Sequence, residues 1–480
     1  MATQLFIDGE WVDAHGATFT TVNPATEEVL AEVGAADQSD VDAAVAAARG
    51  AFENPTWREM NPVERANLLF KLADALEAEA DEVARIETQD VGQPLGVSRN
   101  ANIGTSIEHL RYYAGWVTKI TGETNPISFP DTLHYTRREP VGVCALITPW
   151  NFPLMILVWK VAPALATGNT IVIKPAEQTP LSAIKLVELA EKVGFPPGVI
   201  NLVNGDGTVG AALTEHDGVD KVSFTGSTEV GRAIVRASAG NLKRLTLELG
   251  GKAPSIIARD SDVDAAVAGN IGGATLNTGQ VCAAYTRFYV DKAREEEFLE
   301  KFVGGVQGLT LGNGLEPGTD LGPLVSAEHL SHVEDLVNTG TQQGAELLTG
   351  GKRTGQKGYF FEPTVFGGVR DDMTIARQEI FGPVMSVLSY EDEDELAALI
   401  ARANDTPYGL AATVWTKDIK FAHRAANGIR AGAVYINMPP IPDQAAPWGG
   451  FKASGWGREM GKYAIDAFTE PKGVWMHYGY

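Results

Sequence analysis

The chain has 480 residues, 44% of them hydrophobic, which is more than one hydrophobic core usually organises, so we expect two or more domains. Its 61 acidic against 39 basic residues give a formal net charge of −22, and such a surface repels nucleic acids and anionic membranes. Two cysteines cannot form a disulfide framework, and neither a signal peptide nor a transmembrane run is visible, so we expect a cytoplasmic protein.

The N-terminal part is expected to be mixed. Residues 1–36 have the pattern of short strands and turns, and helices are predicted over 39–52 and from Pro62 to about Gln89. The polar, turn-rich segment 121–140 contains an alternating run, Tyr135-Thr-Arg-Arg, that is typical of an exposed strand. Such a segment can pack against another subunit or remain a free hairpin, and the sequence leaves both open.

Short β-branched runs then alternate with helical stretches. Strands are predicted at 141–147, 170–174, 199–203, 221–224 and 244–248, with helices at 153–167, 180–193, 209–216 and 228–239. This rhythm predicts a Rossmann-like, doubly wound parallel sheet, whose ligands bind beyond the carboxyl ends of the strands. A second α/β series follows, with helices at 262–278, 294–304 and 327–344 and strands at 287–290 and 384–389.

Two glycine-rich turns follow strands of the predicted sheet. Gly205-Asp-Gly-Thr-Val-Gly210 matches the dinucleotide pattern G-x-G-x-x-G, but the acidic residue expected after the next strand is not clearly present. Thr225-Gly-Ser-Thr-Glu-Val-Gly231 opens another helix, whose N–H groups could hold a pyrophosphate. Tight turns need glycine whatever they bind, so nucleotide binding and simple turn formation both remain open.

The two cysteines have different settings. Cys144 lies in an apolar strand and is expected to fill the core. Cys282 follows the polar loop 277–280, where it is either a half-buried structural residue or an exposed thiol beside an oxyanion-binding N–H. Glu248 ends a strand at the functional edge of the sheet, where it is either a general base with a raised pKa or a cap for the next turn.

Several segments resemble the NAD(P)-dependent aldehyde dehydrogenase superfamily. Leu247-Glu-Leu-Gly-Gly-Lys-Ala-Pro254 and Asn277-Thr-Gly-Gln-Val-Cys282 resemble its two active-site signatures. Further matches follow in order at 149–153, 174–180, 224–231, 379–383 and 447–455, so the resemblance spans essentially the whole chain. It implies that the Cys282 thiolate attacks an aldehyde, Asn151 and the Cys282 N–H hold the oxyanion, and Glu248 activates the hydrolytic water. Lys160 resembles a family lysine near the active site, although a stem lying along apolar surface explains it equally well.

The resemblance also implies an NAD site. Lys174 and Glu177 would bind the adenosine ribose, Gly226 and Ser227 the pyrophosphate, and Glu379 the nicotinamide ribose. The other expected cofactor-binding residues are Ile147, Trp150, Gly207, Leu249 and Phe381. Because a carboxylate at Glu177 repels a 2′-phosphate, NAD is expected over NADP. No metal is expected, since His329 and His332 lack a third ligand.

By the same resemblance, the aldehyde tunnel would be lined by Phe152, Met155, Trp159, Val281 and Trp448, which favours a hydrophobic or aromatic aldehyde. The run 444–450 is reminiscent of betaine-aldehyde dehydrogenases, which keeps a cationic aminoaldehyde as the alternative, although Leu276 and Phe152 depart from that group. A CoA-acylating semialdehyde dehydrogenase would usually lack Glu248, and a non-catalytic protein on this scaffold would be expected to lose Cys282.

The predicted organisation has three parts. Residues 1–121 and 140–248 form the Rossmann-like NAD-binding domain, 249–466 the α/β catalytic domain, and 122–139 with 467–480 a small β oligomerisation element. The resemblance implies that this element joins subunits of a homodimer or homotetramer.

Overall fold

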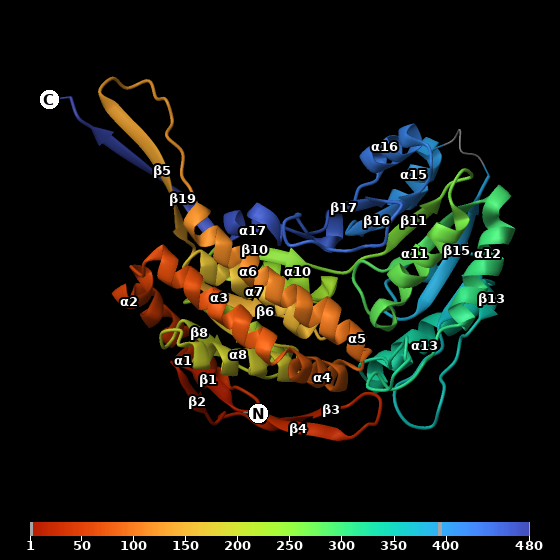
Figure 1. Cartoon of the computed structure of the whole chain (residues 1–480), viewed down its shortest axis with the longest axis horizontal. Helices are drawn as coiled ribbons and strands as arrows, with labels where there is room; N and C mark the ends of the chain where they lie inside the picture. Colours follow the sequence, from red (N-terminus) through yellow and green to blue (C-terminus); the bar gives the residue numbers. More distant parts are fainter. Residues whose placement is uncertain (1–2, 392–395, 480) are drawn as a thin grey trace.

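The computed structural model describes residues 3–391 and 396–479. Two α/β lobes lie side by side, and a pair of long strands projects from the first of them (Figure 1). Each lobe is built on its own sheet, one of eight and one of seven strands. None of the helices in the described ranges is both long enough and apolar enough to cross a membrane.

The sheet of the first lobe has the order β18-β10-β9-β6-β7-β8-β1-β2. Its five central strands are parallel: β6 (Val143–Ile147), β7 (Thr170–Lys174), β8 (Ile200–Leu202), β9 (Lys221–Thr225) and β10 (Arg244–Glu248). At the edges lie antiparallel β1 (Leu5–Ile7), β2 (Glu10–Val12) and β18 (Gly455–Trp456). The chain runs outward from β6 in one direction and then returns to add β9 on its other side. The predicted doubly wound sheet is therefore confirmed, and its strand order reverses between β6 and β9.

Helices cover both faces of this sheet, which explains why its strands are continuously apolar. Along β6, Cys144 and Leu146 face one core and Val143 and Ala145 the other. The first core is shared with α3 (Pro62–Ala78), α4 (Ala80–Val91), α6 (Thr105–Trp116), α7 (Pro153–Ala166) and α8 (Leu181–Val193). The second is shared with α1 (Gln38–Glu53), α9 (Gly207–Glu215) and α10 (Thr228–Ala237). Cys144 thus fills the core, as expected.

The second lobe is a mixed sheet of order β13-β14-β15-β12-β11-β16-β17. Its strands are β11 (Ala253–Ile257), β12 (Tyr285–Asp291), β13 (Glu346–Thr349), β14 (Thr364–Gly367), β15 (Val384–Tyr390), β16 (Ala411–Trp415) and β17 (Ala433–Ile436). Against one face pack α11 (Val263–Thr275) and α12 (Lys292–Gln307), and against the other α13 (Ala327–Gln342), α15 (Leu396–Asn404) and α16 (Ile419–Gly428). Only β13 is antiparallel to its neighbour.

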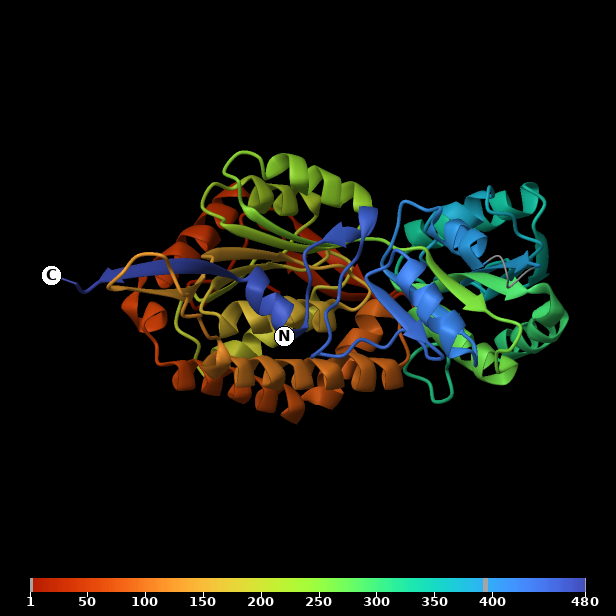
Figure 2. The same ribbon diagram turned by 90° about the horizontal axis from the view of Figure 1, so that it is seen from above.

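The projecting arm pairs two distant segments. β5 (Thr132–Pro140) runs antiparallel to β19 (Thr469–His477) over their full length, and Figure 2 shows the pair extending away from the first lobe. The strand expected near Tyr135 is therefore present. The arm also exposes large apolar side chains, among them Phe129, Trp475 and Tyr478.

Two helix predictions were wrong, one in the middle of the helix and one at its end. The single helix expected from Pro62 to Gln89 is split at Glu79, whose backbone leaves the helical region (φ −108°, ψ 15°). The helix expected over 262–278 ends at Thr275, because Asn277 and Thr278 take left-handed φ values of 47° and 57°. The first sheet takes in β18, and its core takes in Ala464 and Ile465, all of which lie in the segment assigned to the catalytic domain. The same core takes in Phe468 of the predicted oligomerisation element, and the division into domains itself stays a prediction.

The remaining described elements are short. They are β3 (Thr18–Val22), β4 (Val29–Gly34), α2 (Pro55–Arg58), α5 (Leu95–Val97), a π-helix (Ser98–Gly104), α14 (Thr374–Arg377) and α17 (Gly461–Ala467), with 3₁₀ turns at Val117–Lys119, Leu276–Gly279 and Lys452–Ser454.

Candidate active site

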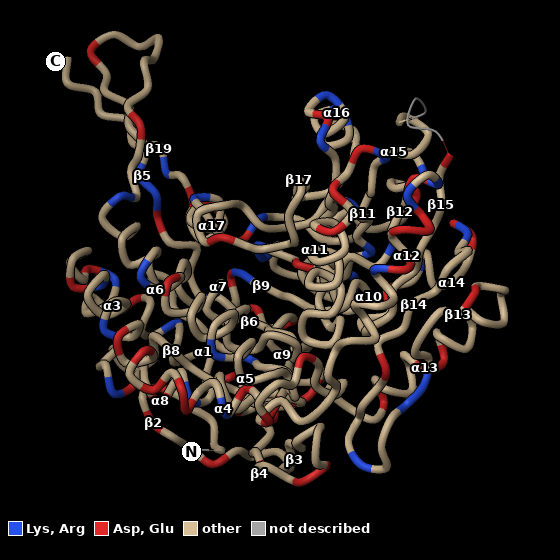
Figure 3. The backbone as a smooth tube through the Cα atoms, turned by 45° about the vertical axis from the view of Figure 1, so that its right-hand side comes forward, with Lys and Arg blue, Asp and Glu red and all other residues tan. Residues whose placement is uncertain are grey.

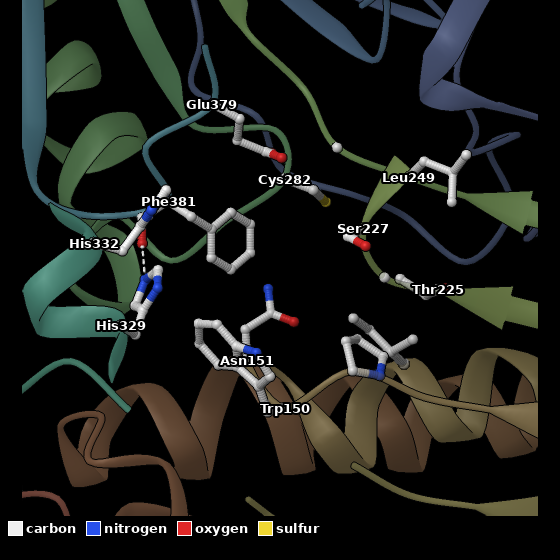
Figure 4. A pocket seen from close by; sticks show the side chains of 14 residues that line it. Trp150, Asn151, Thr225, Ser227, Leu249, Cys282, His329, His332, Glu379 and Phe381 are labelled. Carbon is white, nitrogen blue, oxygen red and sulfur yellow. Dashed lines mark hydrogen bonds between the residues drawn. The ribbon is translucent and has the colours of Figure 1, made fainter. Parts of the chain in front are cut away.

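Two adjoining cavities open at the point where the first sheet reverses its strand order. One, of about 240 Å³, is lined from both lobes and contains Asn151, Cys282 and Glu379 (Figure 4). The other, of about 500 Å³, follows the sheet edge past Lys174 and Glu177. They share Trp150 and the Thr225–Ser227 turn, so they form one continuous cleft. All the expected cofactor-binding residues line this cleft: Ile147, Trp150, Lys174, Glu177, Gly207, Gly226, Ser227, Leu249, Glu379 and Phe381.

Cys282 reaches the cleft on a tight turn. The left-handed residues Asn277 and Thr278 end the preceding helix and redirect the chain. The backbone of Gly251 lies against Cys282, since a Cβ at Gly251 would come within 2.1 Å of the Cys282 carbonyl oxygen. Burial, with the negative charges of Glu379 and Glu248, raises the pKa of the Cys282 thiol to about 12. The thiol is therefore protonated at neutral pH unless a positive charge is bound beside it.

Asn151 lies in the loop between β6 and α7, facing the same cavity as Cys282 (Figure 4). Its side-chain Nδ2 donates to the backbone carbonyl of Gln280 at 2.8 Å, and the backbone carbonyl of Asn151 accepts from Asn277 Nδ2 at 2.8 Å. These two bonds tie the Asn151 loop to the cysteine loop. One N–H of the amide is used in this way, which leaves the second available to a ligand.

A buried carboxylate holds the loop that carries Asn151. Helix α7 begins at Pro153 without a side-chain cap of its own. Glu87 of α4, fully buried, accepts from Leu154 N at 2.8 Å and also from the Ser182 hydroxyl and the Asn102 amide. It therefore satisfies a free N–H of α7, as an N-cap would. Sequence reasoning missed Glu87, because it lies 64 positions before Asn151 with no local pattern linking them.

Glu248 ends β10 and is 4% exposed. Within residues 3–391 and 396–479 neither of its carboxylate oxygens has a hydrogen-bond partner. Burial, with the negative charge of Glu459, raises the pKa of Glu248 well above its usual range, while Lys160 and Arg458 oppose this shift. A Cβ at Gly449 would lie 2.7 Å from Glu248 Oε1, so only glycine leaves room for the carboxylate. An unpartnered carboxyl group with a raised pKa is suited to proton transfer.

Lys160 belongs to a buried polar cluster. It is fully buried, pairs with Glu459, and donates to Thr225 Oγ1 at 2.8 Å. The alternative in which its stem lies along an apolar surface is therefore wrong. Sequence reasoning also missed Glu459, which Trp448 holds through paired backbone hydrogen bonds of 2.8 Å. No motif marks Glu459, since it comes from a loop about 300 residues distant from Lys160.

The cofactor cleft has features that fit a dinucleotide. Ser227 caps α10, so the N-terminus of this helix faces the cleft and favours anions. Glu177, whose Oε2 lies 3.4 Å from Lys174 Nζ, offers a carboxylate at one end for ribose hydroxyls. Glu379 offers one at the other end; it accepts from Gly251 N at 2.8 Å, and burial raises its pKa to about 7.

An aromatic wall completes the cleft; Trp150 and Phe381 were expected there, whereas His329 was not. Trp150 and Phe381 lie edge to face with their ring centres 5.2 Å apart, and His329 lies 5.2 Å from Trp150. His329 Nε2 is 2.7 Å from the carbonyl oxygen of Phe381, whose φ is +60° (Figure 4). Burial lowers the pKa of His329 to about 4, so it is neutral at physiological pH and donates this bond. His332 lines the same cavity.

The five residues expected to line the substrate tunnel lie together. Phe152, Met155, Trp159 and Trp448 are 4–8% exposed and belong to one apolar cluster, against which Val281 and Cys282 pack. The rings of Trp159 and Trp448 lie 5.9 Å apart in an edge-to-face arrangement. The surroundings of Cys282 on this side are therefore apolar and aromatic.

Comparisons with known proteins agree with this geometry. Residues 11–474 match the model of the aldehyde dehydrogenase family. The human mitochondrial aldehyde dehydrogenase is 47% identical over 98% of this chain and 91% of its own. A Bacillus cereus aldehyde dehydrogenase solved as an NAD+ complex is 49% identical with a TM-score of 0.97, covering 100% of this chain and 97% of that one. A Staphylococcus aureus betaine aldehyde dehydrogenase is 40% identical with a TM-score of 0.97, covering 99% and 98%. The chain belongs to the aldehyde dehydrogenase family.

Proposed function

We propose that this protein oxidises an aldehyde to its carboxylic acid with NAD as hydride acceptor. The observation that carries the proposal is the convergence of the Cys282 thiol, the Asn151 amide and the cofactor cleft on one cavity. Glu248 lies buried and unpartnered among the described side chains nearby, with its charge acting on Cys282.

In the first step the Cys282 thiol loses its proton to solvent in the open cleft, and the thiolate Sγ attacks the aldehyde carbon. The carbonyl π electrons move to oxygen, and the resulting oxyanion accepts from the free N–H of Asn151 and from the Cys282 backbone N–H. When bound, NAD+ supplies a positive charge beside the thiol and an acceptor for the hydride. Loss of the hydride with its electron pair restores the C=O bond and leaves a thioester on Cys282.

Glu248 then acts as the general base. It takes a proton from a water molecule, whose oxygen attacks the thioester carbon, and the Cys282 thiolate leaves. Burial makes Glu248 a stronger base than an exposed glutamate, and the Lys160–Glu459 pair sets the local charge on which its pKa depends. We therefore assign Lys160 and Glu459 as positioning residues.

NAD rather than NADP is the proposed cofactor. Glu177 lines the adenosine end of the cleft, where a carboxylate accepts from ribose hydroxyls and repels a 2′-phosphate. Glu177→Ser removes this repulsion, so the ratio of kcat/KM for NADP to that for NAD should rise at least tenfold. An NADP preference in the wild type would contradict the assignment.

The proposed substrate is a hydrophobic or aromatic aldehyde, because the cluster around Cys282 is apolar. A cationic aminoaldehyde is the second candidate: the similarity to a betaine aldehyde dehydrogenase supports it, and the faces of Trp159 and Trp448 could attract a quaternary ammonium. If betaine aldehyde were the only member of an aldehyde panel to be oxidised, the cationic aminoaldehyde would become the first candidate.

Other assignments rest on family resemblance. A homodimer or homotetramer would use the β5–β19 arm, whose exposed Trp475 and Tyr478 favour an interface. The three-part domain division and a cytoplasmic location are proposals of the same kind. Light scattering that gives only the monomer mass would contradict the oligomer.

One assay tests the proposed function. NADH formation is followed at 340 nm with a panel of aldehydes, with and without CoA. Cys282→Ala should abolish NADH formation, whereas the matched variant Cys144→Ala, in the core of the first lobe, should retain it. Unchanged activity of Cys282→Ala would refute the mechanism, and a strict need for CoA would indicate acylating chemistry instead.

A further inference from the structure

A small cavity in the second lobe is lined by cationic side chains. It lies at the amino ends of β11, β16 and β17 and shares no lining residue with the catalytic cleft. Lys252, Arg287, Arg430 and Lys452 line it, together with Tyr408 and uncharged residues, and no carboxylate of the described part of the chain does. Acidic positions occur all around the backbone of this chain, whose net charge is −22 (Figure 3). A cavity whose charged lining residues are all cationic therefore contrasts with the acidic balance of the chain as a whole.

None of the four cations forms an ion pair within 4 Å among residues 3–391 and 396–479, although the carboxylates of Glu379, Asp371 and Asp405 act at longer range on Lys252, Arg287 and Lys452 respectively. Arg287 donates to the carbonyl oxygens of Lys252 (3.0 and 3.1 Å) and Ala403 (2.8 Å) and to the Tyr289 hydroxyl (3.1 Å). Lys452 donates to the carbonyl oxygens of Asn404 and Thr406 at 2.9 and 3.0 Å. These acceptors are uncharged.

Lys252 is the group that most clearly lacks a ligand. Its side chain is 2% exposed, and over residues 3–391 and 396–479 its Nζ has neither a hydrogen-bond partner nor an ion pair within 4 Å. Burial, with the positive charge of Arg287, lowers the pKa of Lys252 to about 7, against a smaller opposing effect of Glu379. Proteins rarely bury a lysine without a partner for its ammonium group.

The size of the cavity limits the ligand. Its volume is about 10 Å³, against about 240 and 500 Å³ for the two cavities of the catalytic cleft. That is room for roughly one water-sized group. A nucleotide, a phosphate ester or a peptide carboxylate does not fit. A water molecule fits, but it brings no negative charge to the cations that line the cavity.

We propose that this cavity binds one small monovalent inorganic anion of the size of chloride. Lys252 and Arg287, both buried, hold it at the base, and the exposed Arg430 and half-buried Lys452 lie at the mouth. The anion supplies the missing acceptor for Lys252 Nζ and places a negative charge in contact with the cations. This inference does not depend on the proposed aldehyde oxidation.

Thermal unfolding of the full chain tests the proposal. Sodium chloride is titrated against sodium gluconate at constant ionic strength, and sodium bromide and sodium sulfate are compared at the same ionic strength. Chloride and bromide should raise Tm along a saturable curve, whereas gluconate and sulfate, which are too large, should not. Lys252→Met should lose the chloride-dependent rise, whereas Lys420→Met, which removes an exposed lysine of α16, should keep it. Identical curves in chloride and gluconate, or a full chloride effect in Lys252→Met, would overturn the proposal.

Two further measurements keep the test independent of the folding of Lys252→Met. Arg430→Gln changes only the exposed mouth of the cavity. It should raise the chloride concentration that gives half of the Tm increase at least threefold, and an unchanged value would count against the site. Crystals soaked in bromide should give an anomalous peak between Lys252 Nζ and the Arg287 guanidinium. A cavity without such a peak would overturn the proposal.

Discussion

Removing the Asn151 amide tests the proposed oxyanion site with a magnitude set by its geometry. The amide has two N–H groups, and one is committed to the Gln280 carbonyl at 2.8 Å. The other stabilises only the charge that develops on the aldehyde oxygen. Loss of one such donor in a water-excluded site costs about 2.7–4 kcal/mol of activation free energy, or roughly 10²–10³ in kcat. Asn151→Ala should therefore lower kcat by that factor.

The same substitution has a separate effect on stability, which the experiment must distinguish. In this variant the buried backbone carbonyl of Gln280 loses its hydrogen-bond donor, which should lower the free energy of unfolding by about 1–3 kcal/mol. Asn204→Ala is the matched control, because this buried asparagine also donates its amide to a carbonyl, that of Gln4, away from the cavity that holds Cys282. Both variants should be less stable to urea, but only Asn151→Ala should lose turnover. A kcat within threefold of the wild type in Asn151→Ala would refute the oxyanion role.

Three other predictions follow from the cleft and its supports. Because burial raises the pKa of Cys282 to about 12, its alkylation by iodoacetamide in the free protein should accelerate about tenfold per pH unit from pH 7 to 10; a plateau near pH 8 would contradict this. Glu87→Gln replaces a charged acceptor of the Leu154 N–H and should destabilise the fold to urea by about 2 kcal/mol; an unchanged urea midpoint would show that α7 does not need it. Gly251→Ala should abolish NADH formation, because the new Cβ would lie 2.1 Å from the Cys282 carbonyl, whereas Gly304→Ala, with open space around its Cβ, should be fully active.

The first sheet could be predicted well because both its faces are buried. Runs such as 143–147 and 170–174 are then continuously apolar and β-branched, which marks them as strands without reference to distant residues. The strand β11 was not foreseen, since Ala253-Pro-Ser-Ile-Ile257 contains a proline and a serine that only its pairing with β12 and β16 accommodates. The break at Glu79 was missed for the opposite reason, because no proline or glycine marks it.

The active-site positions could be named from motifs because the family signatures are local in sequence. The residues that support them are not local. Glu87 contacts the start of α7 across 67 positions, and Glu459 meets Lys160 across 299. His329 was noticed as a histidine on a helix, but its place beside Phe381 depends on how α13 packs at the mouth of the cleft. Such contacts depend on tertiary structure, which periodicity and motif spacing do not contain.

The central claim is that Cys282 carries the acyl group, and trapping that group tests it most directly. Glu248→Gln removes the base for thioester hydrolysis but leaves the thiol in place. After mixing with NAD and an aromatic aldehyde, its intact mass should increase by one acyl group. Peptide mapping should place this group on Cys282, and hydroxylamine should remove it. NADH formation without an adduct, or with the adduct on Cys144, would contradict the account.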